Sequence, residues 1–233
     1  MALWRLCFVL LFSYLGADAK LFTFRNDCEV TIWPGILANA GKPQLANGGF
    51  RLLPHSAATI FAPTGWAGRF WARSQCTFDE TGNGKCATGD CGGALRCNGA
   101  GGVPPATLAE FSLDNPKDFY DISLVDGFNI PISIVPSLTN CSGAECTADL
   151  NRQCRPELQV TSDGKVVACK SACLAFGKPE FCCAGSYSNP NTCKPSVYSK
   201  EFKAACPTAY SYAFDDPTST FTCQGADYSI IFC

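Results

Sequence analysis

The amino-acid sequence predicts a mainly β protein that is exported and cross-linked by disulfide bonds. Short runs that alternate apolar and polar residues recur along the chain, and turn-forming residues separate them. Many short strands with frequent turns are typical of a β-sandwich or a barrel. Of the 17 cysteines, all but Cys7 follow an apolar N-terminal segment that has the features of an export signal.

The predicted export signal covers residues 1–19. Arg5 supplies its positive charge, and the apolar run from Leu6 to Gly16 is too short to span a bilayer as a helix. Ala17-Asp18-Ala19 has the small-x-small form of a cleavage site, so we expect the mature chain to begin at Lys20. No later segment has the unbroken apolar length of a membrane span, so we expect none.

The cysteines that remain after cleavage are even in number, which in a secreted chain indicates a disulfide framework. A zinc site is the competing interpretation, but the chain has no Cys-x2-Cys pair and only one histidine, His55. We therefore expect no metal ion. The cysteine positions alone do not decide which cysteines pair with each other.

Composition restricts the partners and the cofactors of the protein. Charged residues make up 16% of the chain, below the ~25% of typical globular proteins, and the formal net charge is −2. Such a chain has no excess of positive charge to attract nucleic acid or an anionic membrane. No cofactor is expected: Gly82-x-Gly84-x-x-Ala87 formally fits a dinucleotide fingerprint, but Cys86 interrupts it in an oxidised chain.

The predicted strands are short alternating segments at both ends of the chain and in its middle. They are Leu21–Arg25, Val30–Trp33, Ala58–Phe61, Arg69–Arg73, Thr107–Leu113, Ile132–Val135 and Tyr228–Phe232. Turn signals such as Asn47-Gly48-Gly49 and Asp126-Gly127 separate some of them. Because strands are predicted at both chain ends, we expect the first and the last to lie in the same sheets.

Two stretches interrupt the alternating pattern and predict two lobes. The first is rich in glycine, carries four cysteines and begins near residue 74. The second extends from about residue 147 to 206 and has local signals of helices and of a hairpin. These signals are a helix over 197–203 capped by Ser196 and stopped by Pro207, a helix over 171–176 followed by Gly177, and a hairpin whose strands, 158–160 and 165–167, flank Asp163-Gly164.

The glycine-rich stretch carries a motif that identifies a family. Residues 82–97 read GNGKCATGDCGGALRC, with three cysteines, Thr88 and Asp90 in register. This stretch resembles the defining motif of the thaumatin-like family, which comprises pathogenesis-related plant proteins and includes osmotin. Residues 107–111, 120–129, 146–149 and 218–223 agree with the same family, and the cysteines that follow the signal peptide occur in its order.

The resemblance implies the architecture. It predicts a flattened β-sandwich core with two disulfide-rich lobes and a cleft between the core and the larger lobe. The core is assigned to residues 20–73, 105–147 and 207–233, the small lobe to 74–104 and the larger lobe to 148–206. The disulfide pairs that the resemblance implies are Cys28–Cys233, Cys76–Cys86, Cys91–Cys97, Cys141–Cys223, Cys146–Cys206, Cys154–Cys169, Cys173–Cys182 and Cys183–Cys193.

The resemblance also implies an acidic cleft built from one arginine, one glutamate and three aspartates. The matching residues are Arg73, Glu110, Asp121, Asp126 and Asp215, with Asp216 as the alternative to its neighbour. Carboxylates held close together cannot all ionise easily, so at least one carboxyl pKa is expected to rise. An arginine beside them opposes that rise.

The spacing of two of the aspartates does not by itself place both in the cleft. Asp121 and Asp126 are five positions apart, so on one straight strand their side chains would face opposite sides. Because Asp126 precedes Gly127, a turn there could bring both to one side. Three aromatic residues lie nearby in the sequence, Phe119, Tyr120 and Phe128. Their side chains could stack on sugar rings, and the alternative is that they pack in the core.

Other catalytic arrangements have little support. Ser-His-Asp or Cys-His chemistry would depend on His55, which lies in a predicted surface turn, and the cysteines are consumed by disulfide bonds. Asn140-Cys141-Ser142 is a glycosylation sequon, but its middle residue is a bridged cysteine, which disfavours modification. In the family, vacuolar relatives carry a removable tail beyond the last cysteine, and the sequence stops at Cys233, which favours the extracellular space, the apoplast.

Three hypotheses about function follow from the resemblance. The first is a secreted, monomeric defence protein whose cleft binds β-1,3-glucan of fungal walls. The second is a weak endo-β-1,3-glucanase with Glu110 as the acid and Asp126 as the base or nucleophile. The third is an interaction protein, either an inhibitor of microbial hydrolases or a receptor ligand. The charged residues could also form a purely structural ion network.

Overall fold

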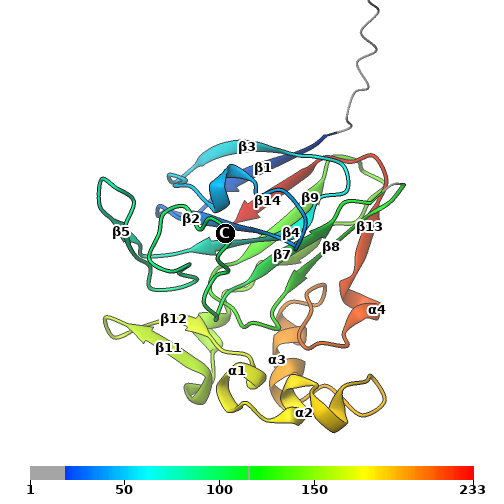
Figure 1. Ribbon diagram of the computed structural model, residues 1–233. Helices are drawn as coiled ribbons and strands as arrows, with labels where there is room; N and C mark the ends of the chain where they lie inside the picture. Colours follow the sequence, from blue (N-terminus) through cyan, green and yellow to red (C-terminus); the bar gives the residue numbers. More distant parts are fainter. Residues whose placement is uncertain (1–18, 115) are drawn as a thin grey trace, which may run out of the picture.

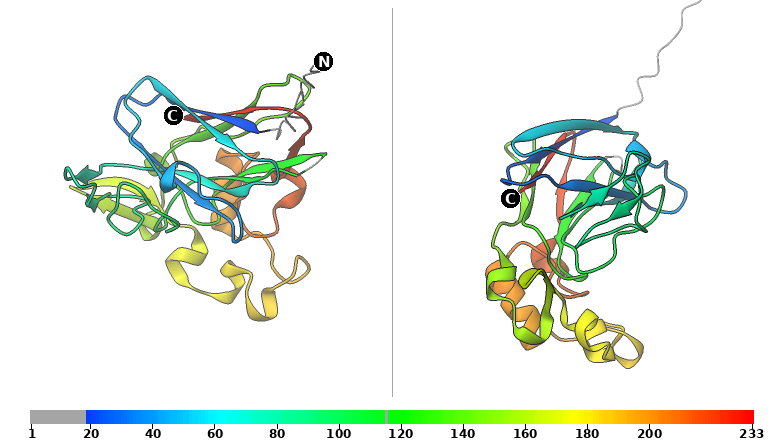
Figure 2. Two further views of the ribbon diagram at one scale, coloured as in Figure 1. Left: turned by 45° about the horizontal axis from the view of Figure 1, so that its top comes forward. Right: turned by 90° about the vertical axis from the view of Figure 1, so that its left-hand side faces the viewer.

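The computed structural model describes residues 19–114 and 116–233 and shows a sandwich of two five-stranded sheets. Figure 1 shows the sheets stacked above a group of short helices, and Figure 2 shows the same separation from two other directions. In spatial order, the first sheet contains β10 (Ala144–Cys146), β9 (Ile132–Pro136), β14 (Tyr228–Phe232), β1 (Lys20–Asn26) and β3 (Ser56–Ala62). The second contains β13 (Phe221–Cys223), β8 (Asp118–Ser123), β7 (Leu108–Ser112), β4 (Ala67–Arg73) and β2 (Trp33–Ala38).

The core between the two sheets is built from inward-facing aromatic and branched side chains. Phe22 and Phe24 of β1 are fully buried, as strand alternation requires, and both contact Phe70 of β4 with ring centroids 4.9 and 5.0 Å apart. Burying one such side chain contributes about 1.5–3 kcal/mol. The core therefore fixes which face of each sheet points outward.

The two ends of the described chain meet in the first sheet. β1 and β14 are parallel neighbours, and Cys28 bonds to Cys233 just beyond them. The expectation that the first and last strands share a sheet is confirmed. The predicted signal peptide lies outside the described residues except for Ala19.

One predicted strand is misplaced. The sequence placed it over 30–33, whereas β2 runs from Trp33 across Pro34 to Ala38. Val30 is 60% exposed and lies outside the strand. Proline cannot donate a ladder hydrogen bond, but β2 is an edge strand, where that loss is tolerated. The other predicted strands agree with the structure to within two residues at either end.

The small lobe packs on the outer face of the second sheet. Its hairpin is formed by β5 (Thr77–Phe78) and β6 (Gly84–Lys85). Elsewhere in the small lobe, Gly89 lies over Trp71 of β4, which is fully buried and donates a hydrogen bond from Nε1 to the Gly89 carbonyl, 2.8 Å away. A Cβ at Gly102 would lie 2.5 Å from the same indole nitrogen, so only glycine allows this close approach.

The larger lobe contains the hairpin and both helices that the sequence predicts. Its elements are η2 (Leu150–Gln153), η3 (Pro156–Leu158), β11 (Gln159–Ser162), β12 (Lys165–Cys169), α1 (Ala172–Phe176), α2 (Pro179–Cys182), η4 (Gly185–Tyr187) and α3 (Val197–Ala205). The Ser196 side chain accepts a hydrogen bond from the amide of Ser199, as predicted for the cap of α3. α1 has the predicted Ser171 cap and the left-handed Gly177 at its end. The remaining helical elements are η1 (Ala46–Gly48) and α4 (Asp216–Ser219).

All eight expected disulfide bonds are present in the structure. Two lie in the small lobe, three lie within the larger lobe, and three join segments that are at least 60 residues apart. The short bonds thus stabilise the lobes, two long bonds lie within the sandwich, and the third, Cys146–Cys206, joins the larger lobe to it. In the described ranges, no helix is long and apolar enough to cross a bilayer.

Candidate functional site

A row of charged side chains crosses the outer face of the second sheet. In the strand register, Arg69 of β4 lies directly opposite Glu110 of β7, which lies opposite Asp121 of β8. Directly opposite residues of antiparallel strands have Cβ atoms about 4.5–5.5 Å apart. We call Arg69, Glu110 and Asp121 the acidic row, and its geometry is set by the backbone of three paired strands.

The acidic row forms the floor of an open pocket of about 440 Å³. Its walls come from the turn after β8 and from residues 210–216, which lead into α4 and include its first residue. The lining residues are Arg69, Leu108, Glu110, Asp121, Ser123, Val125, Asp126, Tyr210, Ala213 and Asp216. The volume lies in the range of about 300–1,000 Å³ that is usual for small-molecule sites. We call this the acidic pocket.

A tight turn brings Asp126 into the acidic pocket, as the sequence predicted it could. The amide of Gly127 donates to the carbonyl of Leu124 over 2.9 Å, and Gly127 has a φ of +86°. The next residue, Phe128, exchanges two backbone hydrogen bonds of 2.8 Å with Cys169 of β12. The turn is therefore fixed on one side by β8 and on the other by the larger lobe.

Tyr210 and Asp216 form the opposite wall. The backbone of Tyr210 pairs with Ile122 and Leu124, with both N···O distances 2.8 Å. Its hydroxyl donates to Asp216 Oδ1 over 3.0 Å. Neither residue carries a motif of its own, and sequence reasoning named only Asp216, as an alternative.

Asp215 is directed away from the acidic pocket. It accepts hydrogen bonds from the amide and hydroxyl of Ser211 and lies 3.1 Å from Lys203 Nζ of α3. Its side chain is only 12% exposed. The structure thus resolves the alternative between the two neighbouring aspartates, because Asp216 lines the pocket and Asp215 anchors the segment beside it.

Arg73 does not lie in the acidic pocket, which corrects the assignment made from the sequence. It is fully buried beneath the small lobe, and its guanidinium donates to the carbonyls of Trp33, Ala94 and Leu95 over 2.8–2.9 Å. Burial lowers the pKa of Arg73 to about 10, partly offset by the charge of Asp90. Arg73 shares its strand face with Arg69, four residues earlier, but the small lobe covers only the Arg73 end.

The carboxyl groups of the acidic row have raised pKa values. Burial raises the pKa of Asp121 to about 8, and the charges of Glu110 and Asp216 add to the effect. Burial also raises the pKa of Glu110; Arg69 opposes this rise and Asp126 supports it. Arg69 Nη1 is 4.0 Å from Glu110 Oε1 and both side chains are 38% exposed, so this ion pair is weak.

One oxygen of Asp121 is left unsatisfied. Asp121 Oδ1 is buried and has no hydrogen-bond partner among the described residues. A buried carboxylate oxygen without a donor is costly, so the site favours a protonated Asp121 or a ligand that donates to it. Sugar hydroxyls are such donors, and carboxylates with one arginine can bind several of them.

The other residues singled out from the sequence lie elsewhere. Tyr120 and Phe128 are 1% and 0% exposed and belong to the core, whereas Phe119 is 43% exposed. His55 lies in an exposed turn, as predicted, and its Nε2 is 3.3 Å from Glu29 Oε2. No cluster of three or more His, Cys, Asp or Glu side chains in the described ranges could hold a metal ion.

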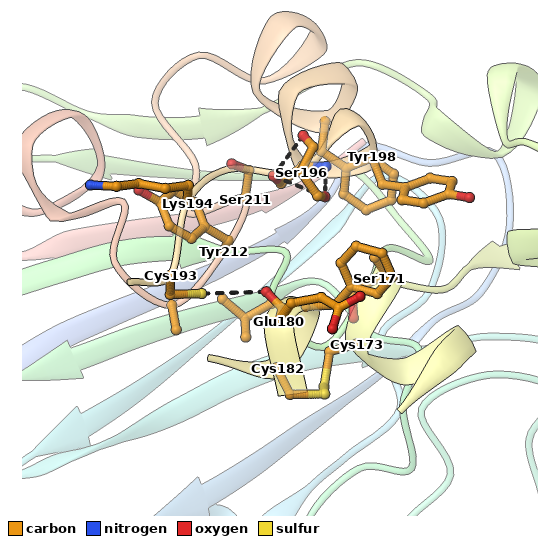
Figure 3. A pocket seen from close by; sticks show the side chains of 16 residues that line it. Ser171, Cys173, Glu180, Cys182, Cys193, Lys194, Ser196, Tyr198, Ser211 and Tyr212 are labelled. Atoms are coloured by element: carbon orange, nitrogen blue, oxygen red, sulfur yellow. Dashed lines mark hydrogen bonds between the residues drawn. A yellow bond between two sulfur atoms is a disulfide. The ribbon is translucent and has the colours of Figure 1, made fainter. Parts of the chain in front are cut away.

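A second, smaller cavity adjoins the acidic pocket and shares Val125 and Ala213 with it. Figure 3 shows this cavity between Ser171 and Tyr198, with the Cys173–Cys182 bond below. Its volume is about 50 Å³, far below the ~300 Å³ of the smallest usual ligand sites. At about 10–15 Å³ per water it has room for a few water molecules and none for a sugar ring.

Fold and pocket together define a disulfide-rich β-sandwich protein that presents converging carboxylates on the outer face of one sheet. The family model that matches residues 26–233 is described as the thaumatin family. The chain therefore belongs to the thaumatin family.

Known proteins resemble the chain over nearly its whole length. It is 54% identical to "Pathogenesis-related thaumatin-like protein 3.5" of Cryptomeria japonica, with 98% of this chain and 95% of the relative covered. It is 49% identical to "Glucan endo-1,3-beta-glucosidase" of Prunus avium, with coverage of 95% and 93%. A solved laminaripentaose-producing β-1,3-glucanase, in complex with laminaritetraose, matches with a TM-score of 0.61, 11% identity and coverage of 91% and 98%, which shows similarity of fold alone.

Proposed function

We propose that the protein is a secreted, monomeric plant defence protein whose acidic pocket binds β-1,3-glucan of fungal cell walls in the apoplast. The observation that carries the proposal is the acidic row, in which the strand register places Arg69, Glu110 and Asp121 side by side in an open pocket. A Prunus avium relative at 49% identity is named a glucan endo-1,3-β-glucosidase, which supports this class of ligand. The cross-linked sheet keeps the pocket preorganised, and preorganisation favours binding.

Replacement of the carboxyl groups on the floor tests the proposal. The variants Glu110→Gln and Asp121→Asn keep the size of the side chain but change its hydrogen bonding. We expect each to weaken binding of a soluble β-1,3-glucan by about tenfold or more in titration calorimetry, equivalent to roughly 1.4 kcal/mol. Glu29→Gln is the matched control, since the Glu29 side chain is 89% exposed and lies outside the pocket. Unchanged affinity in both pocket variants would contradict the proposal.

Hydrolysis of the bound glucan is a second candidate, and the raised pKa values favour it. A glycosidase needs one carboxyl that keeps its proton and a second that is ionised. The raised pKa values of Asp121 and Glu110 suit the first role, and Asp126 across the pocket could act as base or nucleophile. Release of reducing ends from soluble β-1,3-glucan would support hydrolysis if Glu110→Gln or Asp121→Asn abolishes it. Binding without release would leave the protein a glucan-binding protein.

A further inference from the structure

The wall of the acidic pocket that carries Tyr210 and Asp216 belongs to a stretch with little regular structure. Residues 209–219, which we call the wall segment, lie between α3 and β13, and α4 is their longest regular element (Figure 1). Backbone hydrogen bonds to Ile122 and Leu124 hold Tyr210 in place. Asp216 lies further along the segment, so other contacts must determine where its carboxylate points.

Lys203 of α3 contacts the wall segment at both of its ends. Its Nζ donates hydrogen bonds to the carbonyl of Ala209 over 3.0 Å and to the hydroxyl of Ser219 over 2.9 Å, and it lies 3.1 Å from Asp215 Oδ2. These contacts match the three N–H donors of an ammonium group. Ala209 and Ser219 are fully buried, so Lys203 joins the two ends of the segment inside the protein.

The helix that carries Lys203 is tied to the sandwich. Phe202, the residue before Lys203, is 7% exposed and packs in the core. Cys206, directly after the end of α3, is bonded to Cys146 of β10. Lys203 therefore holds the wall segment from a fixed support.

Asp215 links Lys203 to the acidic pocket. Its Oδ2 accepts hydrogen bonds from the amide and hydroxyl of Ser211, and its Oδ1 accepts one from the hydroxyl of Thr218 over 3.2 Å. These bonds direct the Asp215 side chain toward Lys203. The next residue, Asp216, begins α4 and lines the pocket, so the orientation of one aspartate determines that of the other.

The position of Asp216 matters because its charge acts on the acidic row. Burial is the main cause of the raised pKa of Asp121, and the charges of Glu110 and Asp216 add to it. The charged and titratable side chains that line the pocket with Asp121 are Arg69, Glu110, Asp126, Tyr210 and Asp216. Lys203 and Asp215 do not line it, so Lys203 acts on the row through Asp216.

We propose that Lys203 is a positioning residue that, from outside the acidic pocket, holds Asp216 in the pocket wall. Without the ammonium group, Asp215 loses its partner, the two ends of the wall segment separate, and Asp216 moves away from Asp121. The larger lobe thereby controls the protonation of a carboxyl group on the sandwich. The consequence for glucan binding rests on the proposed function, whereas the change in protonation does not require a ligand.

Titration of Asp121 tests the positioning. Lys203→Met keeps an unbranched side chain without the charge, and we expect the pKa of Asp121 to fall by about half a unit, because a negative charge moves away from it. Nuclear magnetic resonance of the carboxyl carbons measures this pKa in the oxidised protein without a ligand. Loss of the positive charge alone would have the opposite sign, since removal of a cation raises the pKa of nearby carboxyls. An unchanged or higher pKa overturns the proposal.

Two further variants control this titration. Lys200→Met is the matched control, because Lys200 lies on the same helix and is exposed, and it should leave the pKa of Asp121 unchanged. The double variant Lys203→Met/Asp215→Asn removes both charges, so it leaves no buried carboxylate unpaired if the single variant does not fold. It should show the same fall, and a wild-type pKa of Asp121 in the double variant overturns the proposal.

An Asp216→Asn background tests whether Lys203 acts through Asp216. In this background, Lys203→Met should no longer lower the pKa of Asp121, because the charge that Lys203 positions is gone. A fall as large as in the wild-type background overturns the proposal.

Glucan binding separates failure of the positioning from failure of the proposed function. Lys203→Met should weaken binding of a soluble β-1,3-glucan by about threefold, and Lys200→Met should leave it unchanged. A wild-type protein that does not bind the glucan overturns the proposed function, and a fall in the pKa of Asp121 in Lys203→Met then still supports the positioning. Binding that depends on Glu110, together with an unchanged pKa of Asp121 in Lys203→Met, overturns the positioning alone.

Discussion

At the scale of single residues, the acidic row shows how sheet register creates unusual protonation. Glu110 and Asp121 are eleven positions apart in the sequence, yet they lie directly opposite each other in adjacent strands. Burial is the main reason that the pKa of each carboxyl is raised, and neighbouring carboxylates add to the effect. The consequence is a pocket that changes its charge near neutral pH.

This protonation predicts a pH dependence of stability. The pKa of Asp121 is about 8 in the folded protein and about 3.9 in an unfolded chain. Between these values the folded state holds a proton that the unfolded state has lost, so the free energy of unfolding falls as pH rises from about 4 to 8. Asp121→Asn removes this contribution, and its stability relative to the wild type should therefore increase with pH in urea denaturation at pH 4, 6 and 8.

An exposed carboxylate provides the comparison for this experiment. The Asp27 side chain is 41% exposed and pairs with Arg25, two residues away. Asp27→Asn should follow the wild type across the pH range. A constant difference between Asp121→Asn and the wild type at all three pH values would show that the raised pKa contributes nothing to stability.

The sequence predicted most, but not all, of the charged residues of the acidic pocket. Glu110, Asp121 and Asp126 were assigned by resemblance and do line one pocket, but the arginine was misassigned. Arg69 and Arg73 are four residues apart on β4, so their side chains point to the same face of the sheet. The position of the small lobe alone determines which of the two it covers. That placement depends on long-range packing around Trp71, which spacing in the sequence does not encode.

At the scale of elements, the turn after β8 controls the shape of the acidic pocket. Gly127 has a φ of +86°, and a Cβ there would lie 2.6 Å from the carbonyl oxygen of Cys169. Gly164 also has a positive φ, +73°, but a Cβ there would meet nothing within 4 Å. The two glycines therefore share a backbone requirement and differ in their surroundings.

Alanine at these two positions separates the two effects. Gly164→Ala should cost about 1–2 kcal/mol, the usual penalty for a left-handed alanine. Gly127→Ala should cost more, because the turn must also move away from Cys169, and it should weaken glucan binding by displacing Asp126. Urea denaturation and calorimetry of both variants measure these differences. Equal losses of stability with unchanged binding would show that the contact with Cys169 is unimportant.

Local signals explain the elements that could be predicted. Caps such as Ser171 and Ser196, and the turn at Asp163-Gly164, act through neighbouring residues and need no tertiary information. β2 was misplaced because its tolerance of Pro34 depends on its position at the edge of a sheet. Edge position is a property of topology and cannot be read from six residues.

At the scale of the whole molecule, the stabilisation expected from each disulfide bond depends on the length of the loop that it closes. The bond from Cys28 to Cys233 closes a loop of 205 residues, whereas Cys183–Cys193 closes one of 10. In the chain-entropy model, stabilisation increases with the logarithm of loop length, giving about 5 and about 3 kcal/mol at these lengths. The long bond should therefore affect the entire sandwich, and the short one mainly the larger lobe.

Paired serine substitutions test this division. Replacement of Cys28 and Cys233 should lower the free energy of unfolding of the sandwich more than replacement of Cys183 and Cys193, by about 2 kcal/mol. Near-ultraviolet circular dichroism reports the aromatic core during urea denaturation. A greater loss from the short bond would show that strain or residual structure outweighs loop entropy.

The position of β14 also has a consequence for biosynthesis. This strand is the third of five in the first sheet, between β9 and β1, yet every other strand precedes it in the sequence. During translation, β9 with β10 and β1 with β3 cannot join into one sheet until β14 has been synthesised. Until then the nascent chain leaves Cys28 without its partner Cys233 and two strand edges open, so oxidative folding must protect them against premature partners.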